Sequence, residues 1–552
     1  MRRSSLRPAW LASGILALAC SGGTEPGPTD NAVDEACRAS ATLTLQPGEL
    51  TFRDLGQSGG CLRLDAAGAA GAEYVVAAYS GSGLVLASGI RADALFASGA
   101  PTGVAARTLA RPEPSAPPDL HARLRQLERR VAPAAAAAAR ARPAQRALRP
   151  APGERREFLA CADLDCASFT PVVAFARYVG DALAIYVDSL APAGGFTDAE
   201  LDEVGRLFDG EIYRLDTLAF GAPSDVDANG VVIALLTPAV NRLSGAGCAN
   251  GIVLGYFSGL DLAPGEPGSN GGEVFFSLVP DPASATCPVS KSLAVEQLPV
   301  TFMHELQHMI SYNQHVLVRG GDPEATWLNE GLSHFAEELG GRRIPDAPGS
   351  APGSRRNQFA FTNVDNAYGF LLDTDRWWLV MPGLSTGAPE ERGAAWLFVR
   401  WLADHFAGTG DETTVTRRLV ATSATGAVNV EQLTGRPFDE LVGTWLLASH
   451  LDDTPGATLP PLLGYPSWEF RRTFESLRRQ DPGRFPRAWP VVPLEADDRA
   501  FARRFTLRGG SGLFARVQQP PGGRHAHLRL TTPDGQPVAA LAVPRAAIVR
   551  LR

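Results

Sequence analysis

Residues 301–311 have the sequence TFMHELQHMIS, and residues 326–341 have the sequence TWLNEGLSHFAEELGG. In the first stretch His304 and His308 are four residues apart, so on a helix both imidazoles lie on one face, one turn apart. Glu305 is rotated by about 100° from His304 on such a helix, and it can address a water molecule rather than the metal. This arrangement predicts one zinc ion held by the two histidines, with Glu305 as the catalytic base.

A catalytic zinc ion needs a third protein ligand and an open position for water. The pattern HExxHxxGxxH requires glycine and histidine where this chain has Ser311 and Gln314, and His315 is one residue too far along. A glutamate on a second helix is the other known solution. Glu330 lies off the apolar stripe of the second stretch, with His334 one turn further on the same side. We therefore expect Glu330 to complete the metal site.

The pair HELQHMI and WLNEGLSHFAEE resembles the gluzincin clan of zinc peptidases, and within it the hyicolysin-type bacterial metallopeptidases. The resemblance covers about residues 170–450. It implies an α+β fold with a zincin-like metallopeptidase domain, in which a mixed sheet is combined with zinc-bearing helices. It also implies zinc ligation by His304, His308 and Glu330, and a base role for Glu305. Gluzincins with the motif NExxSD have an aspartate where this chain has His334, so His334 is a candidate for orienting a ligand histidine or for acting as an alternative ligand.

The zinc chemistry predicts hydrolysis of a protein or peptide substrate, with Glu305 moving the proton. Tyr368 and Tyr312 are candidate donors to the oxyanion, and nothing in the sequence selects between them. The stretch GGEVFFSLVP, residues 271–280, is a candidate edge strand for pairing with an extended substrate. Two alternatives remain open, namely an inactive peptidase-like binding lipoprotein and a zinc hydrolase of other substrates.

The N-terminal residues indicate export. Arg2, Arg3 and Arg7 precede a short apolar run that ends before Cys20, which is typical of a bacterial signal peptide over residues 1–19. A Leu is usual three places before a lipidated cysteine, and Ala stands there instead. We expect either a lipid anchor at Cys20, attaching the chain to the bacterial envelope at the outer membrane, or a plain secreted protein. Residues 20–36 are rich in Gly and Pro and suit a flexible tether.

The cysteines fit an oxidising compartment. The chain has seven, and six remain if Cys20 carries lipid. Disulfides persist in exported proteins. Sequence order suggests three local pairs among the fifteen connectivities that six cysteines allow, namely Cys37–Cys61, Cys161–Cys166 and Cys248–Cys287.

Composition and patterning divide the remaining chain into four regions. The 552 residues carry a net charge of -8, which argues against nucleic acid as a partner. Alternating apolar and polar residues predict a β-rich domain or propeptide at 37–105 and, after a short linker, a second β-rich domain within 456–552. An Ala/Arg/Pro-rich linker at 106–156, with a helical portion near residues 119–131, is expected to be a solvated hinge. The metallopeptidase domain is expected at 157–455.

Other polar groups have less specific interpretations. The sequence DVDANG places Asp225, Asp227 and Asn229 as in the first half of a calcium loop, but Leu236 stands where the loop needs a bidentate glutamate. We therefore weigh a Ca²⁺ site there against a simple Asx-rich turn. His121 and three other isolated histidines, His315, His405 and His450, are expected to be structural or solvated. Glu337 and Glu338 are expected on a solvated helix face. Pro299 suggests the start of the zinc-bearing helix.

Overall fold

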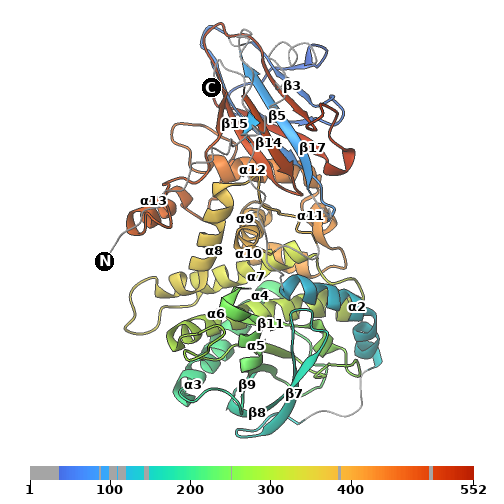
Figure 1. Cartoon of the computed structure of the whole chain (residues 1–552), viewed down its shortest axis with the longest axis vertical. Coiled ribbons are helices and arrows are strands. Elements are labelled where there is room, and N and C mark those ends of the chain that lie inside the picture. Colours follow the sequence, from blue (N-terminus) through green and yellow to red (C-terminus); the bar gives the residue numbers. More distant parts are fainter. Residues whose placement is uncertain are drawn as a thin grey trace, which may run out of the picture.

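The computed structural model describes residues 37–66, 68–85, 89–98, 108–109, 120–141, 148–249, 251–382, 387–496 and 501–552. The predicted signal peptide, the tether and Cys20 lie outside these ranges. The described chain combines three β-sheets with a central layer of helices (Figure 1), which confirms the predicted α+β class. None of the helices in these ranges has the length and apolar character needed to span a bilayer.

A six-stranded mixed sheet supports the candidate site. Its strand order is β11-β12-β10-β9-β8-β7. Strands β9, β10 and β12 are parallel, and the outer strands are antiparallel to their neighbours. The strands are β7 (Arg155–Cys161), β8 (Phe169–Val179), β9 (Leu183–Asp188), β10 (Val232–Leu236), β11 (Gly255–Phe257) and β12 (Val274–Ser277). The predicted edge strand, β12, lies between β11 and β10, so that prediction is wrong; the short strand β11 forms the edge.

The helices begin at local signals that the sequence carries. Thr197 and Glu200 form a capping box at the start of α3 (Asp198–Leu207). Helix α6 (Lys291–Tyr312), which carries His304 and His308, begins after the N-cap Ser290, so Pro299 lies inside it and the predicted start at Pro299 is wrong. A π-helix, η4 (Asn313–Val318), follows α6 and leads toward α7 (Thr326–Arg343).

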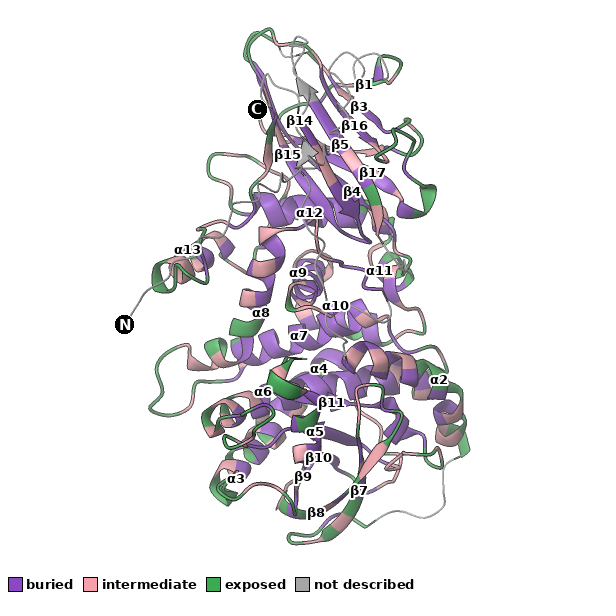
Figure 2. Cartoon of the chain, viewed as in Figure 1, coloured by how far each residue is buried: buried purple, intermediate pink, exposed green. Residues whose placement is uncertain are grey.

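Later helices pack around α7 and bury most of it (Figure 2). Helices α8 (Ser354–Leu372) and α9 (Pro389–Phe406) both contact α7. A Cβ at Gly331 would lie 2.7 Å from the carbonyl oxygen of Ala395, so this glycine permits the close approach of α7 and α9. The remaining helices are α4 (Tyr213–Phe220), α5 (Pro238–Leu243), α10 (Glu412–Val420), α11 (Gly426–Thr434), α12 (Phe438–Leu451) and α13 (Phe470–Gln480).

The two ends of the described chain form one β-sandwich. One sheet has the order β1-β3-β16-β5-β14-β6, and the other has the order β13-β15-β4-β17-β2. Strand β4 lies between two C-terminal strands, β15 and β17. The strands are β1 (Thr42–Leu43), β2 (Leu50–Asp54), β3 (Cys61–Leu64), β4 (Ala72–Ser80), β5 (Ile90–Ser98), β6 (Thr108–Leu109), β13 (Leu494–Ala496), β14 (Phe501–Leu507), β15 (Gly512–Gln519), β16 (Ala526–Thr531) and β17 (Pro544–Arg550). The two β-rich regions expected at opposite ends of the chain thus share both sheets.

Helix α2 (Leu120–Ala141) lies within the segment expected to be a solvated hinge. The structure corrects this expectation, because α2 packs against the 3-10 helix η3 (Gly259–Leu262) and against η4. Its apolar side chains join both major cores: Leu120, Leu124, Leu127 and Val131 in one, and Ala132, Ala135 and Ala136 in the other. Helix α2 is therefore packed on the half of the molecule that carries the candidate metal site.

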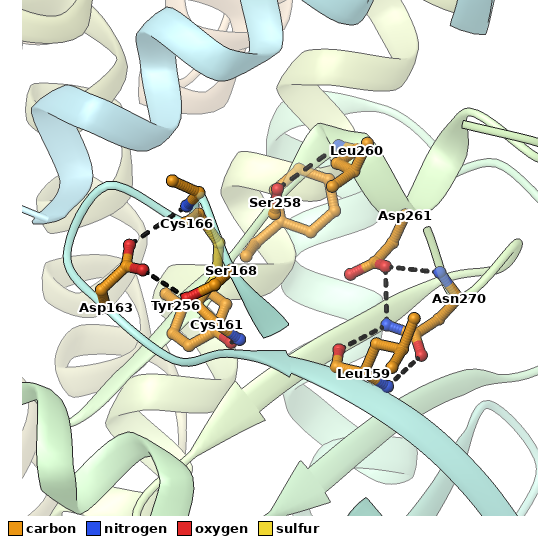
Figure 3. Close-up of a disulfide and its surroundings, with 12 residues drawn as sticks. Leu159, Cys161, Asp163, Cys166, Ser168, Tyr256, Ser258, Leu260, Asp261 and Asn270 are labelled. Atoms are coloured by element: carbon orange, nitrogen blue, oxygen red, sulfur yellow. Dashed lines mark hydrogen bonds between the residues drawn. A yellow bond between two sulfur atoms is a disulfide. The ribbon is translucent and has the colours of Figure 1, made fainter. Parts of the chain in front are cut away.

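The three suggested cysteine pairs are confirmed as disulfides: Cys37–Cys61, Cys161–Cys166 and Cys248–Cys287. Figure 3 shows the second pair, which closes a short loop after β7. The hydroxyl oxygen of Tyr256 accepts a hydrogen bond from the backbone N–H of Cys161 at 2.8 Å. This bond joins the end of β7 to the edge strand β11.

Candidate metal centre

Helices α6 and α7 bring the three predicted ligands together. His304 Nε2 lies 3.1 Å from His308 Nε2 and 3.7 Å from Glu330 Oε2. His308 Nε2 lies 3.6 Å from Glu330 Oε1. Ligand atoms around a tetrahedral zinc ion are roughly 3.3 Å apart, because Zn–N bonds are about 2.0–2.1 Å long. The three side chains are thus close to the spacing that one ion requires.

The environment of Glu330 fits metal ligation. Its side chain is 1% exposed, and neither carboxylate oxygen accepts a hydrogen bond. Burying a carboxylate without such partners is costly unless cations or a metal compensate. Burial alone would raise the pKa of Glu330, but nearby positive charge, first of all the guanidinium of Arg392, outweighs burial and holds the pKa well below its usual value. The ionised form, which binds metals, is therefore favoured.

His121 of α2 is a fourth member of the cluster, which the sequence did not indicate. One nitrogen of His121 and ligand atoms of His304, His308 and Glu330 all lie within 4.8 Å of one another. The expectation that His121 is an isolated structural or solvated histidine is therefore wrong. Burial lowers the pKa of both His121 and His308 well below the usual value, so each imidazole is neutral and able to bind a metal.

Glu337 holds His304 from the side away from the cluster. Its Oε1 lies 2.7 Å from His304 Nδ1, and its Oε2 lies 3.1 Å from His334 Nδ1. Burial would raise the pKa of Glu337, but its interactions with His334 and His304 outweigh burial and lower the pKa to about 2. A carboxylate bonded to the outer nitrogen fixes the tautomer and the orientation of a ligand histidine.

The structure corrects the expectation of a solvated face at Glu337 and Glu338, since both are buried. Glu338 accepts hydrogen bonds from the indoles of Trp396 and Trp468, away from the cluster. Glu337 is seven residues after Glu330, so both lie on one face of α7. That spacing is the signal that could have identified Glu337. His334, which stands at the position of the aspartate in NExxSD, contacts His304 through Glu337 and also directly, by an edge-to-face ring contact at 5.0 Å.

His308 is held by a separate pair of polar side chains. Ser333 Oγ lies 3.1 Å from His308 Nδ1, and it donates to Gln307 Oε1 at 2.5 Å. Ser333 is buried completely, so this contact is protected from water. Each ligand histidine of α6 is thus oriented by a residue of α7.

Glu305 is placed for proton transfer rather than for binding the metal. It is 2% exposed and lies outside the group of four ligand atoms. Burial raises the pKa of Glu305 to about 7, against the opposing charges of His304 and Arg125. A carboxyl group with such a pKa can both accept and release a proton near neutral pH.

A cavity of about 390 Å³ lies beside the cluster, with His304 and Glu305 on its wall. Its other walls come from α2, from residues 251–255, from α8 and from the start of α9. Arg392 of α9 is among the lining residues, and its Nη1 lies 3.6 Å from Glu330 Oε2. Gly255, the first residue of the edge strand β11, also lines the cavity, so a peptide bound there would lie next to the edge of the mixed sheet.

The two tyrosines considered as oxyanion donors lie elsewhere. The hydroxyl of Tyr368 donates to the backbone carbonyl of Arg487 at 3.0 Å and accepts from its N–H at 2.8 Å. Tyr312 is buried and packs edge-on against Phe257. Neither residue lines the cavity, so the geometry gives these two candidates no support.

The candidate calcium residues form a second acidic group. Oxygens of Asp225, Asp227 and the distant Glu273 lie within 4.8 Å of one another. Asn229 instead donates to Asp227 Oδ2 at 2.9 Å and so closes the turn. Glu273 is 1% exposed, and its Oε2 accepts no hydrogen bond. The structure therefore replaces Asn229 by Glu273 in the candidate ligand set.

Comparison with known proteins agrees with the metal-binding cluster. Over 144 residues the chain is 32% identical to the neutral metalloprotease ShpI of Staphylococcus hyicus, and this alignment covers 26% of the chain and 31% of ShpI. The chain thus spans about a third of that relative's length. No family model matches the chain. The similarity is a distant and partial homology to a metalloprotease, and the His/His/Glu cluster is consistent with a zinc site.

Proposed function

We propose that this protein is an exported zinc-dependent metalloendopeptidase. The observation that carries the proposal is the convergence of His304, His308 and Glu330, with the buried carboxyl group of Glu305 beside them on the wall of the cavity. The partial similarity to a neutral metalloprotease supports the same activity. A protein or peptide is the proposed substrate.

In this proposal each residue of the site has a separate role in the hydrolysis. A zinc ion bound by His304, His308 and Glu330 would supply an activated water and a polarised substrate carbonyl. Glu305 accepts a proton from the attacking water on its carboxylate and delivers it to the nitrogen of the leaving amine. Glu337 keeps the His304 ring oriented throughout. Residues 251–257, along the cavity and β11, offer backbone groups to an extended peptide.

The proposed location is outside the cytoplasm. The signal-like residues 1–19 and the three disulfides support export. Acylation at Cys20, which would anchor the chain to the outer membrane, remains part of the proposal. The alternatives of an inactive binding lipoprotein and of a zinc hydrolase of other substrates predict bound zinc without cleavage of proteins.

The test compares Glu305→Gln with Glu296→Gln, which alters an exposed glutamate on the same helix. Both substitutions are made in the parent chain and also in a His121→Ala variant, which lacks the additional histidine of the cluster. Zinc content and casein cleavage are measured on the same samples. We expect about one zinc ion per chain in every variant. The rate of cleavage should fall about 10²- to 10⁴-fold with Glu305→Gln but not with the control Glu296→Gln. Bound zinc with no cleavage in either background would contradict the peptidase proposal.

A further inference from the structure

Helix α2 places a histidine where a fourth metal ligand would lie. His121 Nδ1 is 3.8 Å from Glu330 Oε1. Its ring centroid is 6.1 Å from that of His304 and 6.2 Å from that of His308. The four candidate ligand atoms lie within 4.8 Å of one another, which is on the order of 1 Å more than the roughly 3.3 Å between ligand atoms in a closed tetrahedral site. Side-chain adjustments of about that size would bring all four groups onto one ion.

The number of protein ligands decides what such a site can do. Catalytic zinc sites have three protein ligands and keep one position for water or substrate, whereas sites with four protein ligands are closed. If His121 occupies the fourth position, Glu305 has no water to deprotonate. The arrangement seen here, with α2 in place, therefore corresponds to an inactive site.

The same helix also covers the edge strand beside the cavity. Arg125 Nη2 donates to the carbonyl oxygen of Phe257, the last residue of β11, at 3.0 Å. Glu128 Oε1 accepts from the backbone N–H of Gly259 at 3.0 Å. Arg125 and Glu128 are themselves paired at 3.0 Å and are fully buried. Polar groups of α2 thus engage the backbone that an extended substrate would need for strand pairing.

Further contacts hold α2 over the cavity. Leu124 is fully buried in the core that covers one face of the mixed sheet. Arg123 forms an ion pair with Asp165 in the loop closed by the Cys161–Cys166 disulfide. That loop is hydrogen-bonded to β11 through Tyr256 (Figure 3), and its Leu164 lines the cavity. The helix is therefore docked on the same elements that would bind a substrate.

We propose that His121 is the fourth protein ligand of the metal and that α2 acts as a built-in inhibitor, which must leave the cavity before a peptide can be cleaved. This inference rests on the proposed zinc peptidase function and adds its regulation. The ligand that replaces His121 after α2 leaves is water. Because α2 blocks both the fourth metal position and the edge strand β11, its displacement opens the metal to water and the strand to substrate at the same time.

The test uses the zinc-loaded chain and counts imidazole ligands by X-ray absorption spectroscopy, with casein cleavage measured on the same samples. His121→Ala removes the proposed ligand. Arg130→Ala, on the exposed side of α2, is the matched control. A double variant, Arg125→Ala with Glu128→Ala, loosens α2 without altering His121 and without leaving one buried charge unpaired.

We expect three imidazoles in the parent and in Arg130→Ala, and two in His121→Ala. We expect His121→Ala to cleave casein at least about tenfold faster, because the competent fraction of the parent limits its activity. The double variant should show a gain in the same direction, which keeps the test valid if His121→Ala is unstable. An equal imidazole count in the parent and His121→Ala would overturn the ligand assignment. A lower count without faster cleavage in either variant would overturn the inhibitory role.

Failure of the peptidase proposal has a different signature. Adding Glu305→Gln to His121→Ala should abolish the gain in cleavage while leaving the imidazole count at two. If cleavage persists in that combination, Glu305 is not the base and the proposed mechanism fails, although the assignment of His121 as a ligand stands.

Discussion

Replacing Glu337 by Gln tests whether the carboxylate behind His304 controls metal affinity. Glu337 is buried and lies 2.7 Å from His304 Nδ1, and its pKa is lowered to about 2, so it is ionised at neutral pH. A hydrogen bond to a charged group contributes about 1.5–3 kcal/mol, and a neutral one contributes about 0.5–1.5 kcal/mol. The glutamine keeps the shape and one acceptor but loses the charge. The loss of about 1–1.5 kcal/mol corresponds to a roughly tenfold weaker zinc Kd.

The assay is competition for zinc with a chromophoric chelator, combined with thermal unfolding of the metal-free chain. Glu338→Gln is the matched control, because Glu338 is the next residue and is buried but bonds to Trp396 and Trp468. We expect Glu338→Gln to lower the Tm and to leave the zinc Kd unchanged. A zinc Kd for Glu337→Gln within twofold of the parent value, in a folded protein, would refute the reasoning.

Three further outcomes are expected. Burial and the nearby Arg471 lower the pKa of His450 to about 3, so the unfolded chain binds more protons between pH 6.5 and that value. The free energy of unfolding should therefore fall on acidification through this window by up to about 1.4 kcal/mol per pH unit. Denaturant titrations at several pH values should show a weaker dependence of this free energy on pH for His450→Phe. About 1 mM Ca²⁺ should raise the Tm of the parent but not that of Glu273→Gln, and equal shifts would exclude the acidic group as the site. A chain that lacks residues 37–98 should lose protease resistance in residues 494–552 while the helices stay intact, because the C-terminal strands lose the central strand β4.

The sequence predicted that His304, His308 and Glu330 lie close together because the information for this is local. His304, Glu305 and His308 lie within one helical turn, and the apolar stripe of α7 determines which face carries Glu330. Glu337 was missed although its spacing from Glu330 placed it on that same face. The acidic pair Glu337 and Glu338 was predicted to be solvated because the sequence does not show that α8 and α9 cover α7.

His121 and the shared sandwich could not be predicted for a different reason. The Ala/Arg/Pro composition around His121 is typical of linkers, and only tertiary packing brings α2 to the cluster. Strand β11 has three residues, too few for a periodic pattern to identify it as an edge. Arg504 pairs with Asp93 across 411 residues. Alternation predicts that each segment is a strand, but it contains no information about which partner a strand has.

The interleaved sandwich imposes an order on folding. Strand β4 is synthesised early, yet both of its neighbours, β15 and β17, are among the last strands to be made. Until they arrive, β4 has two unpaired edges, and such edges promote aggregation. The helical half between them can reach its native packing first, and pairing of the terminal strands then joins the two ends of a nearly finished molecule. Prematurely terminated chains would lack those neighbours, and both edges of β4 would stay unpaired.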